Sequence, residues 1–337
     1  MNKKPTKNYI NLLKFIAMIF VVCMHVISKA MPNYEYTSTT YKIMLFIDIL
    51  LRSSVPLFIF ISGNLMLNKK YTIKQVLYKL IKYYLLFIVF NSMYKIVDCI
   101  MIQHESINII NILVDELTLK SIYQMWYFKL LLLTYASVPI FQYLISKNNK
   151  ILDTITLTIL IILFIVMPYI IGGTYFEVSY YLVFLLYYYL GYYIKKYEFK
   201  YENILFLIIF GLSYYYTYSK SVVLDHDYYY LNFQLINTLL IGLSIFKIFS
   251  VLEKYLTNDK LNNIFKYLAS YSFYIFIFHG LVIGLLSKIN VINIYSYNNL
   301  LLIISNTIIV YVCTLVLSIV LKNVKEIVIK MYKKIIK

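Results

Sequence analysis

Apolar runs of about 20 residues recur along this chain, and each has the length that an α-helix needs to cross a bilayer. Short polar connections separate the runs. Because hydrocarbon leaves backbone N–H and C=O groups without partners, lone segments of this kind fold as helices. The sequence therefore predicts an all-α integral membrane protein with about ten transmembrane helices. The predicted spans are residues 9–29, 43–66, 81–102, 124–145, 151–171, 178–195, 203–219, 230–249, 267–288 and 299–321.

The overall composition agrees with a lipid environment. Hydrophobic residues make up 61% of the chain and charged residues only 14%, whereas soluble domains carry about 45–50% apolar and about 25% charged residues. A soluble fold has too little polar surface here to cover so large an apolar core. Part of the 39 tyrosines is expected in the aromatic belts at the two membrane interfaces.

The net charge of +17 raises the possibility of a nucleic-acid partner, but the distribution of lysine argues against one. When the polar connections are assigned alternately to the two sides, 23 lysines fall on the side of the N-terminus and five on the other. Basic connections face the cytoplasm. We therefore expect both termini to be cytoplasmic, and the lysines to face anionic membrane lipid rather than nucleic acid.

No soluble domain is expected beside the membrane domain. The longest polar connections, at about 103–123 and 250–266, are too short to bury a core of their own. We therefore predict one transmembrane domain over residues 1–337. The three cysteines all fall within predicted spans and show no metal-ligand spacing, so no metal site is expected.

Polar residues inside the spans are the best guide to function, because they are costly in hydrocarbon and mark functional sites. Two pairs of opposite charge have helical spacing: Lys95 with Asp98, and Asp48 with Arg52. Each pair is expected to form on its own helix, which would explain the charges structurally. Lys129 lies near a helix end, where a long side chain reaches water.

The first span carries Lys14 and His25, 11 residues apart. That spacing places them within roughly 20° on one helix face, with a rise of about 16 Å between them. Lys14 would lie near the cytoplasmic end and His25 in the outer half. The structural alternatives are that Lys14 extends to the interface and that His25 bonds a neighbouring helix. A titratable imidazole inside a bilayer is nevertheless a functional candidate.

Four short segments carry a further signal. They are Lys14-Phe-Ile-Ala with His25, the run RSSVPLFIFISG from Arg52 to Gly63, the run MWYF from Met125 followed by Pro139, and the run SFYIFIFH from Ser272 to His279. In this order and with ten spans, they resemble the bacterial acyltransferase-3 family of integral membrane O-acyltransferases. That family has arginine in place of Lys14 and an arginine-rich loop in place of Lys79 and Lys82. Lysine keeps the charge but lacks the bidentate fork.

The resemblance implies an enzyme of the bacterial cytoplasmic membrane that uses acyl-CoA as donor, either acetyl-CoA or succinyl-CoA. The acceptor would be a hydroxyl of a cell-surface carbohydrate or glycolipid. His25 is the candidate general base, because imidazole titrates near the operating pH, and Arg52 would stabilise developing negative charge. The remaining predicted site residues are Lys14, Lys79 and Lys82 for the CoA phosphates, and Trp126, Tyr127 and His279 for the acceptor. Two alternatives stay open: His279 orients His25 or satisfies a hydrogen bond in the core, and Trp126 with Tyr127 belongs to an aromatic belt.

Two other functions fit an intramembrane histidine and lysine. A transporter or flippase for a polysaccharide or glycolipid would also place such residues in the membrane, and a sensory or scaffolding protein would need no chemistry. An enzyme turns over acyl-CoA in detergent, whereas transport requires a sealed compartment. The acceptor, the choice between acetyl and succinyl, and the oligomeric state stay open at this point.

The orientation of the chain can be tested by cysteine labelling. In a variant that lacks the native cysteines, we expect a cysteine at Asn33 to react with an impermeant thiol reagent on intact cells. Cysteines at Lys70 and Asp259 should react only after the membrane is opened, because the positive-inside rule places both in the cytoplasm. Labelling of the Lys70 site on intact cells would contradict the orientation.

Overall fold

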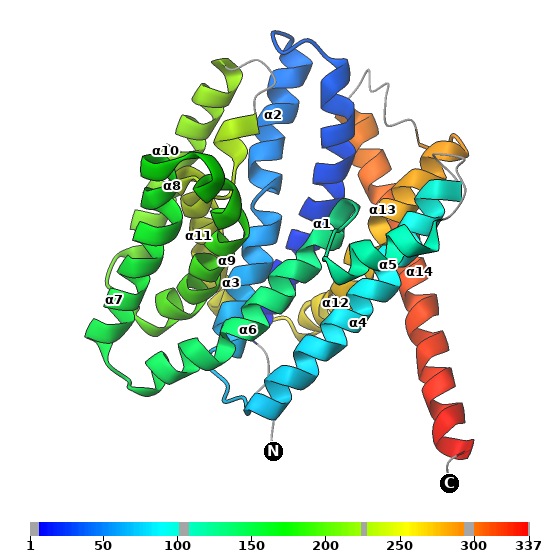
Figure 1. Ribbon diagram of the computed structural model, residues 1–337. Coiled ribbons are helices and arrows are strands. Elements are labelled where there is room, and N and C mark those ends of the chain that lie inside the picture. Colours follow the sequence, from blue (N-terminus) through cyan, green and yellow to red (C-terminus); the bar gives the residue numbers. More distant parts are fainter. Residues whose placement is uncertain (1–6, 101–107, 224–227, 293–299, 336–337) are drawn as a thin grey trace. The chain divides into compact units, whose positions relative to one another are not determined.

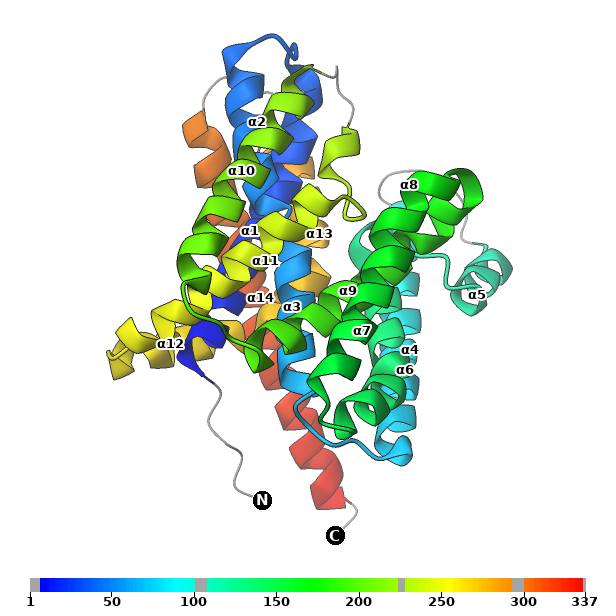
Figure 2. The same ribbon diagram turned by 90° about the vertical axis from the view of Figure 1, so that its left-hand side faces the viewer.

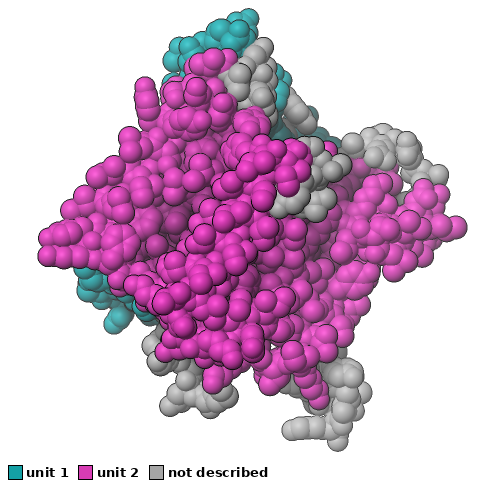
Figure 3. Space-filling view, turned by 60° about the vertical axis from the view of Figure 1, so that its left-hand side comes forward, with its two compact units in different colours: residues 1–54, 252–337 teal, residues 55–251 magenta. Residues whose placement is uncertain are grey.

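The computed structural model describes residues 7–100, 108–223, 228–292 and 300–335, and the secondary structure in these ranges is entirely helical (Figure 1). The chain divides into two compact units, which Figure 3 draws in different colours. The first unit combines Met1–Ser54 with Leu252–Lys337, and the second is Val55–Val251. The first unit is therefore built from the two ends of the sequence.

The first unit is organised around α1 (Asn8–Ala30), which packs against all the other long helices of this unit. The apolar side of α1 is fully buried at residues such as Leu13, Ala17 and Val22. The other elements of the unit are η1 (Met31–Asn33), α2 (Thr39–Leu51), η6 (Leu252–Tyr255), α12 (Asp259–Ala269), α13 (Ser272–Lys288) and α14 (Leu300–Ile335).

A carboxylate from the far end of the sequence caps the start of α1. The backbone N–H groups of Asn8 and Tyr9 donate to Oε1 and Oε2 of Glu253, at 3.2 and 2.7 Å. The first N–H groups of a helix have no partner within it, and the helix dipole favours negative charge there. Glu253 therefore ties η6 to the N-terminal helix.

The second unit also consists of helices in its described part (Figure 2). Its elements are α3 (Ser54–Met66, whose first residue belongs to the first unit), α4 (Ile73–Asp98), α5 (Ile109–Leu117), η3 (Tyr123–Trp126), α6 (Tyr127–Ser146), α7 (Lys150–Ile161), η4 (Ile162–Val166), α8 (Met167–Ile171), α9 (Gly173–Lys196), α10 (Glu202–Val223), η5 (Tyr228–Leu231) and α11 (Ile236–Val251).

Two glycines let α3 and α9 cross in direct backbone contact. A Cβ atom added at Gly63 would lie 1.8 Å from the carbonyl oxygen of Tyr188, and one added at Gly191 would lie 2.1 Å from that of Phe60. Both distances are far below van der Waals contact. Small residues that allow close backbone approach are typical of helix pairs in membranes. The family-like run that begins at Arg52 ends at one of these glycines.

Seven helical segments of the described chain are long and apolar enough to cross a membrane, and an eighth is bent. The bent pair is α12 and α13, which meet at 56°; Figure 2 shows the change of direction. The protein is thus an all-α protein with seven or eight candidate spans. The straight segments are Asn8–Asn33, Thr39–Met66, Ile73–Asp98, Tyr123–Ser146, Lys150–Ile171, Tyr229–Tyr255 and Leu301–Glu326.

The predicted count of ten spans is not confirmed. The predicted spans 178–195 and 203–219 lie in α9 and α10, which are helical and long enough but are not among the apolar segments. Both helices are rich in tyrosine, whose hydroxyl lowers their hydropathy. Two further predicted spans, 81–102 and 299–321, reach beyond the described residues at one end.

The buried ion pairs of the second unit correct the interpretation of one lysine. Lys247, which falls near the end of the predicted span 230–249 and was counted among the 23 lysines of the cytoplasmic side, lies within α11 and is 1% exposed. Its Nζ lies 2.5 Å from Oε1 of Glu202 and 3.5 Å from Oε1 of Glu198. The nearby Lys195 also pairs with Glu198 and lowers the pKa of that carboxyl. The charge of Lys247 is therefore neutralised inside the protein.

The crossing of α3 and α9 predicts a sharp difference between two glycine substitutions. Gly63→Ala should lower the free energy of unfolding by about 3 kcal/mol, because the new Cβ overlaps a backbone atom that cannot move independently. Gly211→Ala in α10 is the matched control: its Cβ would meet no atom within 4 Å, so the change should be below about 1 kcal/mol. Thermal unfolding of both variants in detergent tests this, and equal melting temperatures would contradict the crossing.

Candidate active site

Two histidines meet inside the first unit. His25 comes from α1 and His279 from α13, and their ring centroids lie 5.0 Å apart with an interplanar angle of 38°. His279 is 1% exposed and His25 is half-buried. His25 and His279 are 254 positions apart in the sequence, so no helical spacing relates them. The packing of α13 against α1 brings them together.

A backbone hydrogen bond fixes the tautomer of His279. Its Nδ1 lies 3.1 Å from the carbonyl oxygen of Ile275, one turn earlier in α13. A carbonyl oxygen only accepts, so Nδ1 carries the hydrogen. In the neutral ring, Nε2 then has a free lone pair and acts as an acceptor. His279 therefore presents a hydrogen-bond acceptor on the side of its ring away from Ile275.

Arg52 stands where α2 ends. Pro56 has no N–H group to bond the carbonyl of Arg52 four residues earlier, and the helix breaks at Arg52 and Ser53 before α3 begins. The Nε of Arg52 donates to Oδ2 of Asp48 at 2.8 Å. The pair expected from their spacing is thus confirmed.

The Asp48–Arg52 pair lies near the histidines in an asymmetric environment. The Asp48 side chain is fully buried while that of Arg52 is 21% exposed, and Oδ1 of Asp48 has no hydrogen-bond partner in the described chain. Arg52 is close enough to His25 to act on its charge, as is Lys29. Oδ2 of Asp48 therefore fixes the orientation of the Arg52 guanidinium.

Lys14 lies on the same unbroken helix as His25, as the sequence predicts. Both are in α1, and Lys14 is half-buried. The 11-residue separation corresponds to a rise of about 16 Å along this helix. The next residue, Phe15, packs against Phe265 of α12 and Tyr311 of α14, with ring centroids 5.8 and 6.1 Å apart. At this level α1 thus packs through Phe15 against α12 and α14.

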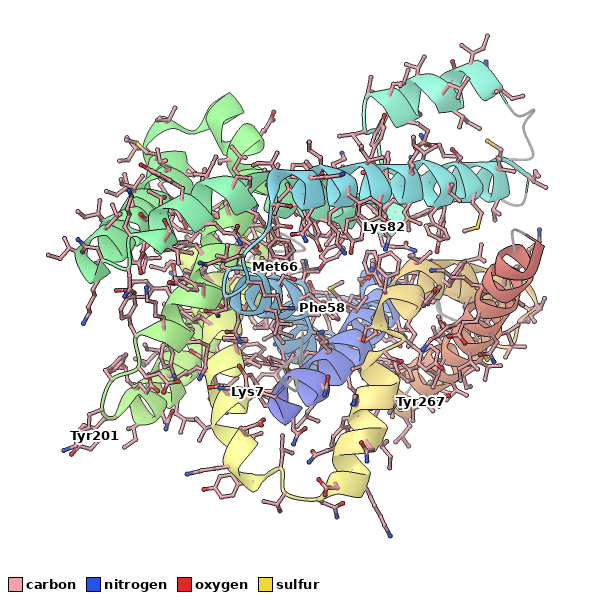
Figure 4. The ribbon with its side chains drawn as sticks, turned by 90° about the horizontal axis from the view of Figure 1, so that it is seen from below. Lys7, Phe58, Met66, Lys82, Tyr201 and Tyr267 are labelled. Carbon is pink, nitrogen blue, oxygen red and sulfur yellow. The ribbon has the colours of Figure 1, made fainter. Side chains whose placement is uncertain are left out.

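The other predicted site residues belong to the second unit. Lys79 and Lys82 lie in the first half of α4, where Figure 4 labels Lys82, and Lys82 stands over the ring of Tyr83. Trp126 and Tyr127 lie where η3 passes into α6. These four residues occupy two places within the second unit.

The two aromatic residues differ in exposure. Tyr127 is buried, at 9% exposure, whereas Trp126 is half-buried. Trp126 packs among the rings of Tyr127, Tyr181 and Phe184, with centroids 6.2 to 6.5 Å away. Trp126 thus stays partly accessible, while the ring of Tyr127 packs edge-on against it.

The expected pair of Lys95 with Asp98 is wrong. Lys95 instead forms ion pairs with Asp115 and Glu116 of α5, at 3.2 and 3.3 Å. Asp98 accepts a hydrogen bond from the hydroxyl of Tyr123. The connection after α4 folds back as α5 and brings two carboxylates to Lys95. Two carboxylates neutralise a buried ammonium group more fully than the single carboxylate of Asp98 would. The consecutive acids Asp115-Glu116 in a polar connection were the available sequence signal.

The electrostatics of Asp115 follow from this arrangement. Burial raises the pKa of Asp115, but the hydrogen bonds and charges of Lys95 and Lys120 outweigh burial and hold the pKa below its ordinary value. Asn91 adds a hydrogen bond from Nδ2 to Glu116 at 2.9 Å. This cluster fastens α5 to α4 and has a structural explanation. Within the described ranges, no three His, Cys, Asp or Glu side chains are grouped so as to hold a metal ion.

Comparison with known proteins gives one family match. The family model described as an acyltransferase domain, acyltransferase family 3, matches residues 7–322, which is nearly the whole chain. No curated protein and no solved structure matches the sequence. The matched range contains both histidines, Arg52 and Lys14.

The Asp48–Arg52 pair predicts non-additive effects on stability. Asp48→Ala and Arg52→Ala should each lower the free energy of unfolding by about 3 kcal/mol, because each leaves a charge inside the protein without its partner. The double variant should lose less than the sum of the two, since it leaves no uncompensated charge. Unfolding of all three variants in detergent measures the coupling. Strict additivity would show that the two side chains do not stabilise one another.

Proposed function

Because the chain belongs to the acyltransferase-3 family, we propose that it moves an acetyl or succinyl group from cytoplasmic acyl-CoA to a hydroxyl of a cell-surface or lipid-linked carbohydrate. Its family and its apolar helices make it a multi-pass membrane acyltransferase; the donor, the acceptor and the bacterial cytoplasmic membrane are our proposals. The observation that carries the proposed chemistry is the meeting of His25 and His279, whose ring centroids lie 5.0 Å apart.

We assign the general base to His25. A thioester is already activated, so the enzyme must position it, remove the hydroxyl proton and stabilise the oxyanion. A ring nitrogen of neutral His25 takes the proton while the acceptor oxygen attacks the thioester carbonyl. The C–S bond then breaks, and the proton passes to the CoA sulfur. A neutral imidazole suits this role inside a membrane because it carries no charge before the reaction.

Of the roles that the sequence left open for His279, orienting His25 fits the geometry better than binding the acceptor. Its Nδ1–H is engaged by Ile275, so the free Nε2 can accept a hydrogen bond from an N–H of His25. That bond would leave the second nitrogen of His25 as the proton acceptor. We therefore assign His279 as a positioning residue: its hydrogen bond to one nitrogen of His25 would decide which nitrogen of His25 carries the proton.

Arg52 would stabilise the oxyanion of the tetrahedral intermediate. A guanidinium has five N–H donors, and the bond to Asp48 uses the one on Nε. Asp48 thus fixes the orientation of the guanidinium plane while leaving its charge beside His25. A preorganised cation of this kind acts where charge develops and needs no rearrangement during the reaction.

The arrangement along α1 supports a reaction that bridges the membrane. With cytoplasmic termini and ten spans, Lys14 lies near the inner face and His25 in the outer half. CoA is a charged nucleotide that does not cross lipid, but its pantetheine arm is comparable in length to the rise of about 16 Å between these residues. Of the lysines predicted to meet CoA phosphates, Lys14 lies on this helix, whereas Lys79 and Lys82, like Trp126 and Tyr127, belong to the second unit. A water-accessible path among the helices is then required.

Substitution of His25 tests the proposed function directly. His25→Ala should lower acyl transfer from acyl-CoA by roughly 10² to 10⁴ in rate, through loss of general-base catalysis, while the melting temperature stays close to that of the parent. The measurement is CoA release by purified protein in detergent with a carbohydrate acceptor. His279→Gln should cost less and shift the pH profile.

Two results would contradict this assignment. A folded His25→Ala variant with full activity would remove His25 from the mechanism. If the parent protein turns over no acyl-CoA in detergent but moves a glycolipid across sealed vesicles, the transporter alternative is correct.

A further inference from the structure

The start of α13 differs from the start of α1. At α1, Glu253 supplies a carboxylate to the first N–H groups. At α13, the residue before the helix is Tyr271, whose own side chain makes no capping hydrogen bond. The chain turns by 56° there between α12 and α13. A helix of 17 residues carries a partial positive charge at this end, which is a favourable place for an anion.

A buried hydroxyl at the same helix end lacks a partner. Ser272 is the first residue of α13 and is 8% exposed, and its Oγ has no hydrogen-bond partner in the described chain. Its side chain belongs to the first turn, where the helix N–H groups also lack partners within the helix. A buried hydroxyl without a partner costs about 1–3 kcal/mol. A ligand that supplies an acceptor to Ser272 would remove this cost.

Two lysines of α14 stand beside the same helix end. Nζ of Lys322 lies 3.5 Å from Oγ of Ser270 and 4.5 Å from the ring centre of Tyr271. Nζ of Lys325 lies 3.5 Å from the hydroxyl of Tyr274. Unlike Lys95, Lys196 and Lys247, which are paired with carboxylates, neither has an ion pair in the part of the chain that the structure describes. Both positive charges thus face hydroxyl groups.

We propose that the N-terminus of α13, Ser272, Lys322 and Lys325 form a binding site for a phosphate group. Backbone N–H groups, a hydroxyl and two ammonium groups are the donors that phosphate sites use. If the proposed function holds, the phosphate belongs to the nucleotide part of the acyl-CoA donor. The sequence had suggested Lys14, Lys79 and Lys82 for this task.

The position of the site along α13 fits the proposed donor. Seven residues separate Ser272 from His279, which corresponds to a rise of about 10 Å in one continuous helix. An extended pantetheine arm is longer than this rise. With its phosphates at the start of α13, the donor can therefore place its thioester at the pair of His25 and His279. All the residues involved belong to the first unit.

The test measures binding rather than turnover. The full chain is placed in nanodiscs of phosphatidylcholine, which carry no net charge, and the affinity for coenzyme A is measured by calorimetry. Lys322→Gln and Lys325→Gln should each weaken binding roughly tenfold, and together roughly a hundredfold. Lys260→Gln on α12 removes the same charge from an exposed position and should have no effect. Ser272→Ala should weaken binding while leaving the melting temperature of the free protein equal or higher.

The outcomes separate this inference from the proposed function. Equal affinity for coenzyme A in the parent and the double variant would overturn the site while leaving coenzyme A as the donor. If the double variant loses only its retention of phosphatidylglycerol in mixed nanodiscs, the phosphate is a lipid headgroup and the nucleotide assignment is wrong. If the parent binds no coenzyme A in any membrane, the proposed donor itself is wrong. Loss of binding confined to Lys322, Lys325 and Ser272 variants supports the site.

Discussion

A charge held within apolar helices must find its counter-charge in the protein, because hydrocarbon offers neither water nor ions. This constraint shapes both units. In the first, Asp48 holds Arg52 where the helix breaks before Pro56. In the second, α5 folds back so that its carboxylates reach Lys95. Helix breaks and turns therefore occur where a charge has to be neutralised.

Histidine is the exception to this rule and for that reason suits the proposed chemistry. A neutral imidazole needs a hydrogen bond rather than a counter-ion, and His279 obtains one from its own helix. The protein thus keeps proton-accepting groups inside the membrane without the cost of a permanent charge. Arg52, the cation that would stabilise the negative charge formed in the reaction, is already paired with Asp48, which lowers the cost of keeping it inside the protein.

The sequence predicted the helical class, the first helix and its common face for Lys14 and His25, because hydrophobic periodicity and helix geometry are local properties. The spacing of Asp48 and Arg52 was equally informative, since both lie on one helix. The sequence could not predict which helices contact one another. Lys95 has an acid at helical distance, yet its partners come from the following connection, and Lys247 meets Glu202 from another helix. The meeting of His25 and His279 likewise depends on tertiary packing, which no spacing encodes.

The cap on α1 has a consequence for how the protein is made. The N–H groups of Asn8 and Tyr9 donate to Glu253, which lies 244 or more positions later in the sequence. Helix α1 also packs on α12, α13 and α14, which come late in the sequence. Ribosomes produce the N-terminus first, so α1 and α2 are made long before α12, α13 and α14. The whole of Val55–Val251 must be synthesised in between. The histidine pair consequently forms only after α13 has been made, and a chain released early from the ribosome carries His25 without the helix that completes the site.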